Sequence, residues 1–341
     1  MNKVAKVNQE NKSKKKGVIA SIPNETIGLV FALFAIIAIF SLFNKNYFSV
    51  ANMMNILVAA SLTGLVAIGE SYLVIAGLVD LSAGSVAAFA SVLAAVLLSS
   101  GVGFFLTIVI VVVVGIMVGL INGLVITKIK LEPFIATLAT MSIIRGFAYI
   151  ICDGRPIYIS NEVAIAFGRN RLLGIPYPVI ILIVAFIVFG IVLAKTRFGR
   201  SIYVIGGNKE AARLAGLNPK KITLKLFMIT SALASLGGVI LATRMNSGQP
   251  SAALGLEFDA ITAAVLGGIA FSGGVGTIFG TVLGVLILQG FNTGLIMMNV
   301  PSFWQLVARG MLLLIALGFD YLRKRNREKK LLEESMAALN K

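Results

Sequence analysis

A small set of polar and charged side chains interrupts long apolar stretches of this sequence, and these side chains are the first candidates for chemistry. In apolar surroundings a charge or an amide is stable only when it is paired, hydrogen-bonded or placed beside water. Such residues therefore either hold helices together or line a path for a polar solute or an ion. The set comprises Glu70, Asp80, Ser82, Asn122, Arg145, Asp259, Gln289 and Asn292.

The same inventory of residue types does not favour an enzyme. The sequence contains no histidine, the most frequent general base, and a single cysteine, Cys152. Its carboxylates are not clustered as acid–base pairs or metal ligands would be. We therefore predict no catalytic residues, no metal site and no enzymatic activity on this chain.

The composition indicates that membrane-spanning helices position these residues. Of the 341 residues, 58% are hydrophobic and 13% are charged, and the mean hydropathy is +0.95. A soluble protein has about a quarter of its residues charged, and a helix crosses a bilayer with about 20 apolar residues. We predict an all-α integral membrane protein of about ten transmembrane helices, some short or broken. Eight spans with two half-helices fit equally well. The segments are 27–43, 55–77, 83–99, 104–127, 133–152, 177–194, 224–245, 259–271, 276–295 and 303–322.

Two of the acidic residues stand at the start of short, small-residue segments. Asp80 lies in "GLVDLSAGS" and Asp259 in "GLEFDAITAAVLGG". Each is interpreted as a helix N-cap, whose carboxylate accepts free backbone N–H groups. The alternative is that broken helices in the two halves of the chain line a transport path. A further charged residue within an apolar segment is Arg309. It lies two turns into the last segment, where its long side chain is able to snorkel outward.

The net charge of +16 predicts the orientation of the chain rather than a nucleic-acid partner. Lys and Arg residues gather at both ends of the chain and around the central polar loop, as the positive-inside rule expects of cytoplasmic segments. We predict a cytoplasmic tail over residues 1–24 and a membrane domain over residues 25–322. Its cytoplasmic loop covers residues 195–223, and a second cytoplasmic tail covers residues 323–341. Both termini are then cytoplasmic, in a multi-pass protein of the cell membrane.

The central loop contains "GGNKEAARLAGLNPKK" at residues 206–221, which predicts a very short helix with its own start and stop signals. A helix this short is marginal in water, so we expect it to dock onto a partner. Asn208 is a typical N-cap, Glu210 suits the first turn, and Gly216 suits the left-handed stop. Asn218 and Pro219 are typical of the start of the next helix. The predicted docking residues are Asn208, Glu210, Ala211, Ala212, Gly216, Asn218 and Pro219.

The heptad "EAARLAG" at 210–216 resembles the Glu-Ala-Ala-x-x-x-Gly signature of permease subunits of ATP-binding-cassette importers. Its context is more specific, because "GLVDLSAGS", "FIATLATMSIIRG" and "FDAITAAVLGGIAFSGGVGTIFGTVLG" follow the order seen in ribose and related monosaccharide permeases. The resemblance covers roughly residues 48–321. The chain departs from the family at Leu78, where glycine is usual. Branched-chain amino-acid permeases share the style of the loop, so an amino acid stays an alternative solute.

The resemblance implies an ATP-driven importer whose other parts lie on other chains. In that family the central loop is a coupling loop that docks on an ATPase subunit, and an extracytoplasmic binding protein delivers the small polar solute. A second permease copy or close homologue completes the path. No P-loop motif occurs in the sequence, so we predict no cofactor on this chain and ATP use by the partner subunit. The outer loop at 153–176 is a candidate contact for the binding protein. The alternative function is an ion-coupled secondary transporter with Glu70 and Asp80 as ion sites.

Overall fold

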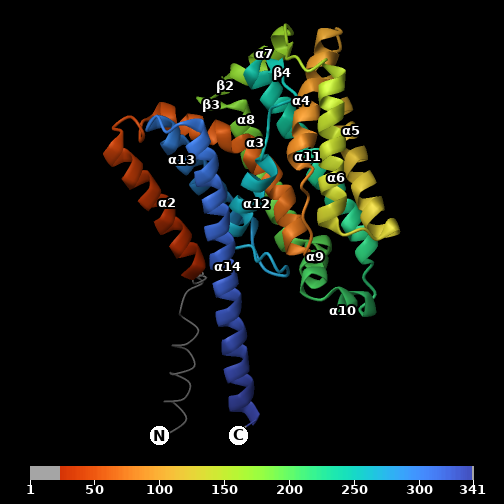
Figure 1. The fold of residues 1–341 in the computed structure, drawn as a ribbon, viewed down its shortest axis with the longest axis vertical. Helices are drawn as coiled ribbons and strands as arrows, with labels where there is room; N and C mark the ends of the chain where they lie inside the picture. Colours follow the sequence, from red (N-terminus) through yellow and green to blue (C-terminus); the bar gives the residue numbers. More distant parts are fainter. Residues whose placement is uncertain (1–23, 340–341) are drawn as a thin grey trace, which may run out of the picture.

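The computed structural model describes residues 24–339, and most of them lie in helices. Figure 1 shows a bundle in which α9 and α10 lie at the same end as the C-terminus, and α7 lies at the other end. In chain order the elements are α2 (Asn24–Phe43), α3 (Val50–Ile75), α4 (Ala83–Ser99), α5 (Phe104–Leu124), the π-helical turn η1 (Val125–Ile129), α6 (Pro133–Ile151), β1 (Ile157–Tyr158), α7 (Glu162–Arg169), β2 (Arg171–Leu172), β3 (Ile175–Pro176), α8 (Tyr177–Lys195), α9 (Arg197–Gly207), α10 (Lys209–Leu214), α11 (Pro219–Met245), β4 (Ser247–Gly248), α12 (Leu256–Leu266), α13 (Ile278–Met297) and α14 (Ser302–Leu339).

The predicted all-α membrane fold is confirmed, with the ten segments divided between long and short helices. Eight described helices are long and apolar enough to cross a membrane, namely α2, α3, α5 with η1, α6, α8, α11, α13 and the first part of α14. The other two are α4, with 17 residues, and α12, with 11 residues. At about 1.5 Å per residue, α12 covers only about half of the hydrocarbon core. The structure therefore agrees with the variant of eight spans and two shorter membrane helices.

The core is built around α11, which packs against α3, α4 and α5 (Figure 1). Small residues allow this close packing, because helices in lipid approach each other where side chains are missing. A methyl group added at Gly119 of α5 would lie 2.3 Å from the carbonyl oxygen of Phe227 in α11, and one at Gly115 would lie 1.9 Å from the Ser235 hydroxyl. The repeated glycines of α5 therefore serve helix packing.

The outer loop is more structured than the sequence predicted. Its first strand, β1, pairs with β4, and β2 pairs with β3 as a small hairpin. The helix α7 lies between β1 and β2, and its N-cap is Asn161, whose side chain accepts a hydrogen bond from the Ala164 N–H at 3.0 Å. It packs on α11, where an added methyl group at Gly168 would lie 2.3 Å from the Thr243 carbonyl oxygen. This region forms a small cap that is tied to the end of the bundle.

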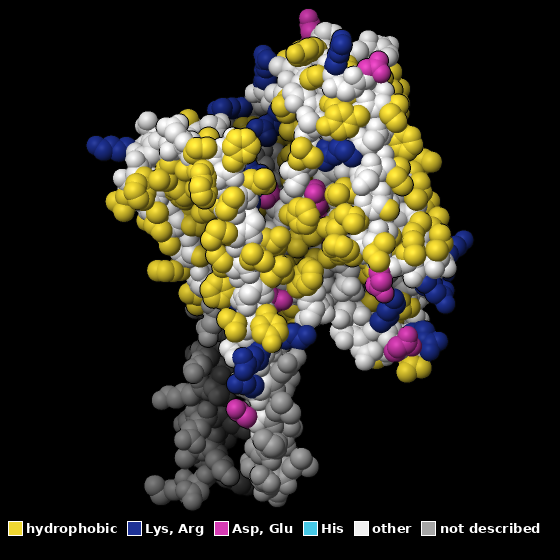
Figure 2. All heavy atoms as spheres, viewed as in Figure 1, with side chains coloured by type: hydrophobic (Ala, Val, Ile, Leu, Met, Phe, Trp, Pro, Cys, Tyr) yellow, Lys and Arg dark blue, Asp and Glu magenta, His cyan; other side chains and the backbone are white. Residues whose placement is uncertain are grey.

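The predicted tail boundaries can be compared with the structure only at the C-terminal side. The tail assigned to residues 1–24 lies outside the described residues except for Asn24, the first residue of α2. No break occurs at residue 322, because α14 continues through Leu339. Figure 2 shows hydrophobic side chains over the broad middle of this face, with most of the charged side chains toward the two ends.

Candidate functional site

The docking segment folds as its sequence signals predicted. The Asn208 side chain caps α10 by accepting a hydrogen bond from the Ala211 N–H at 2.9 Å. Gly216 ends the segment with a φ of 82°, and the Leu217 N–H donates back to the Ala212 carbonyl at 3.1 Å, as in a Schellman motif. These bonds satisfy most of the free backbone groups of α10 locally. A helix of six residues can therefore keep its shape at the end of the bundle.

The next helix start is confirmed in the same way. The Asn218 side chain accepts a hydrogen bond from the Lys221 N–H at 3.1 Å, and Pro219 is the first residue of α11. Glu210 forms an ion pair with Arg213 at 3.0 Å, on side chains that are about 70% exposed. Pairs this exposed contribute little to stability, so both side chains are free to engage a partner.

The apolar side of α10 is divided between the protein and the solvent. Ala212 is fully buried, so it anchors α10 to the bundle and does not belong to an exposed patch. Leu214 is 83% exposed at the tip of the helix, flanked by exposed Ala211 and Ala215. Leu214 is therefore the largest apolar side chain on the exposed side of this short helix.

The sequence reasoning missed α9, which precedes α10 and shares a residue with it. Asn208 is the C-cap of α9, through its N–H to the Val204 carbonyl at 3.0 Å, and also the N-cap of α10. One residue therefore joins the two helices without a linker between them. The Thr196 side chain, which accepts from the Gly199 N–H at 3.1 Å, marks the start of α9 and was the local signal that could have revealed it.

The end of α9 contacts the backbone of two other segments, and we call this contact the glycine junction, formed by Ile75, Gly206, Gly273 and Gly274. The Gly274 N–H donates to the Ile75 carbonyl at the end of α3 at 2.8 Å. A methyl group added at Gly206 would lie 1.7 Å from that carbonyl oxygen and 2.7 Å from the Gly274 nitrogen. Only glycine fits at this point. The junction therefore joins α9 to the segments that follow α3 and α12.

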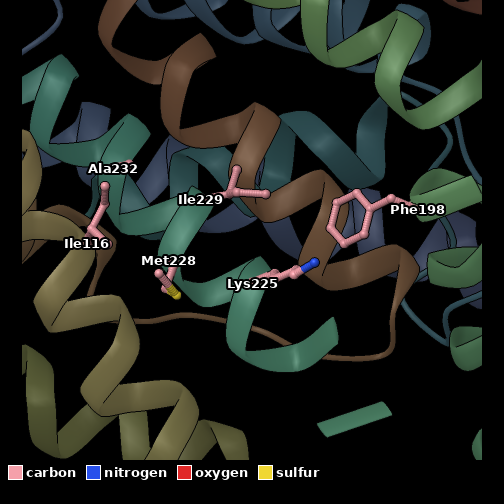
Figure 3. Close-up of a pocket in the computed structure, with 6 residues that line it drawn as sticks. All are labelled: Ile116, Phe198, Lys225, Met228, Ile229 and Ala232. Atoms are coloured by element: carbon pink, nitrogen blue, oxygen red, sulfur yellow. The ribbon is translucent and has the colours of Figure 1, made fainter. Parts of the chain in front are cut away.

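Two further contacts hold α9 in place. The Tyr203 hydroxyl donates to the Gly276 carbonyl at 2.7 Å, and burial raises the pKa of Tyr203, so this hydroxyl keeps its proton. Near the start of the helix, the Lys225 ammonium lies 6.0 Å from the centre of the Phe198 ring. Figure 3 shows these two side chains at the edge of a shallow, mostly apolar hollow of about 370 Å³ between α5, α9 and α11.

Four of the candidate intramembrane residues meet at the break between α3 and α4, a grouping that the sequence analysis did not predict. The Asn122 amide donates to the Ser82 hydroxyl at 2.9 Å, and that hydroxyl donates to Asp80 at 2.5 Å. The Ser82 N–H also donates to Asp80 at 2.8 Å, and the Asp80 N–H reaches Glu70 at 3.4 Å. All four side chains are fully buried. The chain of hydrogen bonds fixes the break to α5.

The predicted N-cap role of Asp80 is wrong by two residues. The cap of α4 is Ser82, which makes no side-chain capping bond, and Asp80 instead binds the backbone of the turn before it. One oxygen each of Glu70 and Asp80, and the Asn122 carbonyl oxygen, are buried and have no hydrogen-bond partner among the described residues. This site therefore keeps acceptor capacity that the described residues do not use.

Glu257, an acidic residue that the sequence analysis did not single out, connects the start of α12 with the break between α3 and α4. It lies in the first turn of α12 and is 4% exposed. An added methyl group at Gly84 of α4 would lie 2.1 Å from its carboxylate oxygen, so the two short helices touch through this glycine. Glu257 is also close enough to Arg145, Asp80 and Glu70 for their charges to interact. A charged residue in the first turn of a short membrane helix was the signal for it.

Arg145 holds the segment that leads into α12. Its guanidinium donates to the carbonyls of Pro250 at 2.8 Å and Ala252 at 2.6 Å. It therefore stabilises irregular backbone within the membrane domain, where unpaired carbonyls are costly. Among the described residues, Glu70 accepts one hydrogen bond, from the Asp80 N–H at 3.4 Å, and makes none with Arg145.

The N-cap role of Asp259 is also wrong, because α12 begins earlier, with Gly255 as its cap and Asp259 in the first turn. Its carboxylate lies 3.7 Å from the Arg309 guanidinium of α14. Arg309 thus pairs within the chain in addition to reaching toward the surface. The pair lies beside a groove between α12 and α14.

The two remaining candidates lie on α13 and belong to the packing of the bundle. The Gln289 amide donates to the Thr63 hydroxyl of α3 at 2.7 Å, so it fixes one helix to another. Asn292 is 6% exposed, and its carbonyl oxygen has no partner among the described residues. Among the residues that the structure describes, no group of three or more His, Cys, Asp or Glu side chains is arranged to hold a metal ion.

Comparisons with known proteins identify the family. The family described as "Branched-chain amino acid transport system / permease component" matches residues 52–317. The chain is 43% identical to the ribose import permease protein of Bacillus subtilis, over 87% of this chain and 92% of that protein. It is 41% identical to the L-arabinose transport system permease protein of Escherichia coli K12, over 86% and 88%. It is 38% identical to the ribose import permease protein of Haemophilus influenzae, over 85% and 91%. No solved structure matched the chain. Because the match covers nearly the whole membrane domain, the chain belongs to this family of ATP-binding-cassette transporter permeases, as a multi-pass protein of the cell membrane.

Proposed function

We propose that this chain is the membrane-spanning subunit of an ATP-driven importer that takes up a monosaccharide such as ribose or arabinose. The observation that carries the proposal is the exposed helix α10, capped at both ends and tipped by Leu214, at the basic end of the bundle. An ATPase subunit that grips this helix would supply the energy, and the chain itself would hold no cofactor and catalyse no reaction. Its relatives by sequence carry names of sugar permeases.

The similar proteins support a monosaccharide, and not a branched-chain amino acid, as the transported solute. The family description names amino acids, but the similar proteins described above are permeases for ribose and for L-arabinose. At 36–43% identity over nearly the whole chain, these proteins support a neutral polyol as the solute. A solute-binding protein would deliver it to the end of the bundle that carries α7 and the β2–β3 hairpin.

A second copy of the chain, or a close homologue, would complete the transport path. Only 6% of the residues in the spanning window of α14 are buried, and 17% of those in α6, although both helices carry polar groups. The short helix α12 packs against α14 (Figure 1). A helix face with charges is costly to leave in lipid, which favours a partner subunit over this face.

Docking on the ATPase is tested by a single charge placed at the tip of α10. We expect Leu214→Asp to abolish co-purification with the ATPase subunit, because a carboxylate cannot be buried in an apolar contact without losing its hydration. The matched control is Leu173→Asp, since Leu173 is 95% exposed on the β2–β3 hairpin at the other end of the bundle.

The measurement is the amount of ATPase retained on the tagged permease in detergent, for the wild type and both variants. Leu173→Asp should retain the wild-type amount, and Leu214→Asp should retain less than about a tenth of it, which corresponds to about 1.4 kcal/mol or more of lost binding free energy. If Leu214→Asp retains the ATPase as well as the wild type does, α10 is not the docking element.

A further inference from the structure

We propose that the groove between α12 and α14 is a contact site for the transported sugar, at which Asp259 and Arg309 bind adjacent hydroxyl groups. The inference rests on the proposed function and narrows it to one site. The groove has a volume of about 380 Å³. It is open at Gly310 of α14, where an added methyl group would meet no atom of the described residues within 4 Å.

The charged pair in this groove has unused binding capacity. Its two atoms are 3.7 Å apart, whereas charge-assisted hydrogen bonds are about 2.7–2.9 Å long. The Nε of Arg309 is buried and has no partner among the described residues. The Arg309 side chain is 35% exposed and that of Asp259 is 14% exposed, so both can be reached from the groove.

The chemistry of the pair matches a neutral polyol. A carboxylate only accepts hydrogen bonds and a guanidinium only donates them, so one sugar hydroxyl can donate to Asp259 while its neighbour accepts from Arg309. The two charges cancel, and a neutral ligand therefore needs no counterion there. Phe258 precedes Asp259 on α12, is 45% exposed, and offers an apolar surface to the C–H face of a sugar ring. A few polar groups in an apolar hollow are typical of small-molecule sites.

The position of the groove suits a transport path. Arg309 lies seven residues after Ser302, the first residue of α14, which is about 10 Å along the helix. Figure 2 shows charged side chains within the hollowed middle of this face, between hydrophobic surfaces. Since charges are costly in lipid, this depth favours a path filled with water and closed by a second copy.

Thiol protection in the assembled transporter tests the site while leaving the charged pair intact. The only cysteine, Cys152, is replaced by serine, and Gly310→Cys or Gly318→Cys is added to the permease. Gly318 lies on the same helix outside the lining of the groove and is equally free of neighbours. Vesicles carry the permease with its ATPase and binding protein, and a membrane-permeant maleimide labels the new thiol with and without D-ribose.

We expect D-ribose, at about ten times the concentration that gives half-maximal protection, to slow the labelling of Gly310→Cys about tenfold. The labelling rate of Gly318→Cys should stay unchanged. Equal rates with and without ribose at Gly310→Cys overturn the site. Equal protection at both positions overturns it as well, because a general closure would then explain the effect. Protection by L-leucine in place of ribose would assign the pair to a zwitterion and overturn the sugar site. If the wild-type permease takes up no ribose in the same vesicles, the proposed function is contradicted. If it takes up ribose normally but ribose does not protect Gly310→Cys, only the site is contradicted.

A second readout uses matched substitutions of two aspartates on the wild-type background. Asp259→Asn should lower ribose uptake about tenfold to a hundredfold, as expected when a charged hydrogen-bonding partner is lost. Asp320→Asn should change uptake by less than about twofold, because Asp320 accepts a hydrogen bond from the Phe271 N–H at 3.0 Å and an amide oxygen can still accept it. Normal uptake by Asp259→Asn contradicts the proposal.

Discussion

Gly206→Ala is expected to reduce sugar uptake to background while the assembled transporter continues to hydrolyse ATP. The added methyl group would stand 1.7 Å from the Ile75 carbonyl oxygen and 2.7 Å from the Gly274 nitrogen. These two backbone groups are hydrogen-bonded to each other, so neither can move away without breaking the junction. The helix α9 must then separate from α3 and from the segment after α12. Any ATP-driven motion of α10 would then no longer reach the end of α3 or the segment after α12.

The neighbouring glycine provides the matched control. In the part of the chain that the structure describes, no atom lies within 4 Å of a methyl group added at Gly207, so Gly207→Ala should retain uptake within about twofold of the wild type. The measurement is the ratio of sugar transported to ATP hydrolysed in reconstituted vesicles. Wild-type coupling in a folded Gly206→Ala protein would mean that the junction transmits nothing.

A milder variant covers the case in which Gly206→Ala fails to fold. Tyr203→Phe removes only the hydroxyl that donates to the Gly276 carbonyl, at a cost of about 1 kcal/mol. It should lower the same transport ratio several-fold without adding bulk. If it leaves the ratio unchanged, the attachment of α9 to the segment after α12 does not carry the motion.

Asp80→Ala is expected to destabilise the protein by about 1–3 kcal/mol and to abolish uptake. Asp80 accepts hydrogen bonds from both the backbone and the hydroxyl of Ser82, and these groups would be left buried without a partner. Asp80→Asn keeps an acceptor oxygen at the same place and removes the charge. We expect it to retain the folded state and most of the uptake.

The pair of variants separates a structural Asp80 from an ion-binding one. Thermal unfolding in detergent measures the stability of each variant, and vesicle uptake measures its transport. An Asp80→Asn protein with wild-type stability and no uptake would show that the charge itself is needed. That result would favour the ion-coupled alternative over the hydrogen-bonding role.

The features that the sequence predicted well depend on neighbouring residues. The caps at Asn208, Gly216 and Asn218 follow from side chains and backbone angles within a few positions. The membrane helices follow from apolar runs of sufficient length. Long-range contacts were not predictable in this way. The pairing of Asp259 with Arg309 depends on how α12 and α14 are placed, and nothing near either residue encodes it.

The errors at the two aspartates have one physical cause. Asp80 and Asp259 were both assigned as N-caps, but one lies before its helix and the other lies within the first turn. A short acidic side chain suits each of these positions, so residue type alone does not fix the register. The glycine junction was hidden for a related reason. A glycine needed for close backbone approach has the same appearance in the sequence as one needed for a turn.

The most direct test of the account is D-ribose uptake into vesicles that contain the permease and its ATPase, with the binding protein outside. Ionophores abolish the proton and sodium gradients in one arm, and ATP is left out in the other. We predict full uptake with internal ATP and no gradient, and none with a gradient and no ATP. Uptake that needs the gradient and ignores ATP would contradict the account, and Glu70 and Asp80 would then be the residues to study as ion sites.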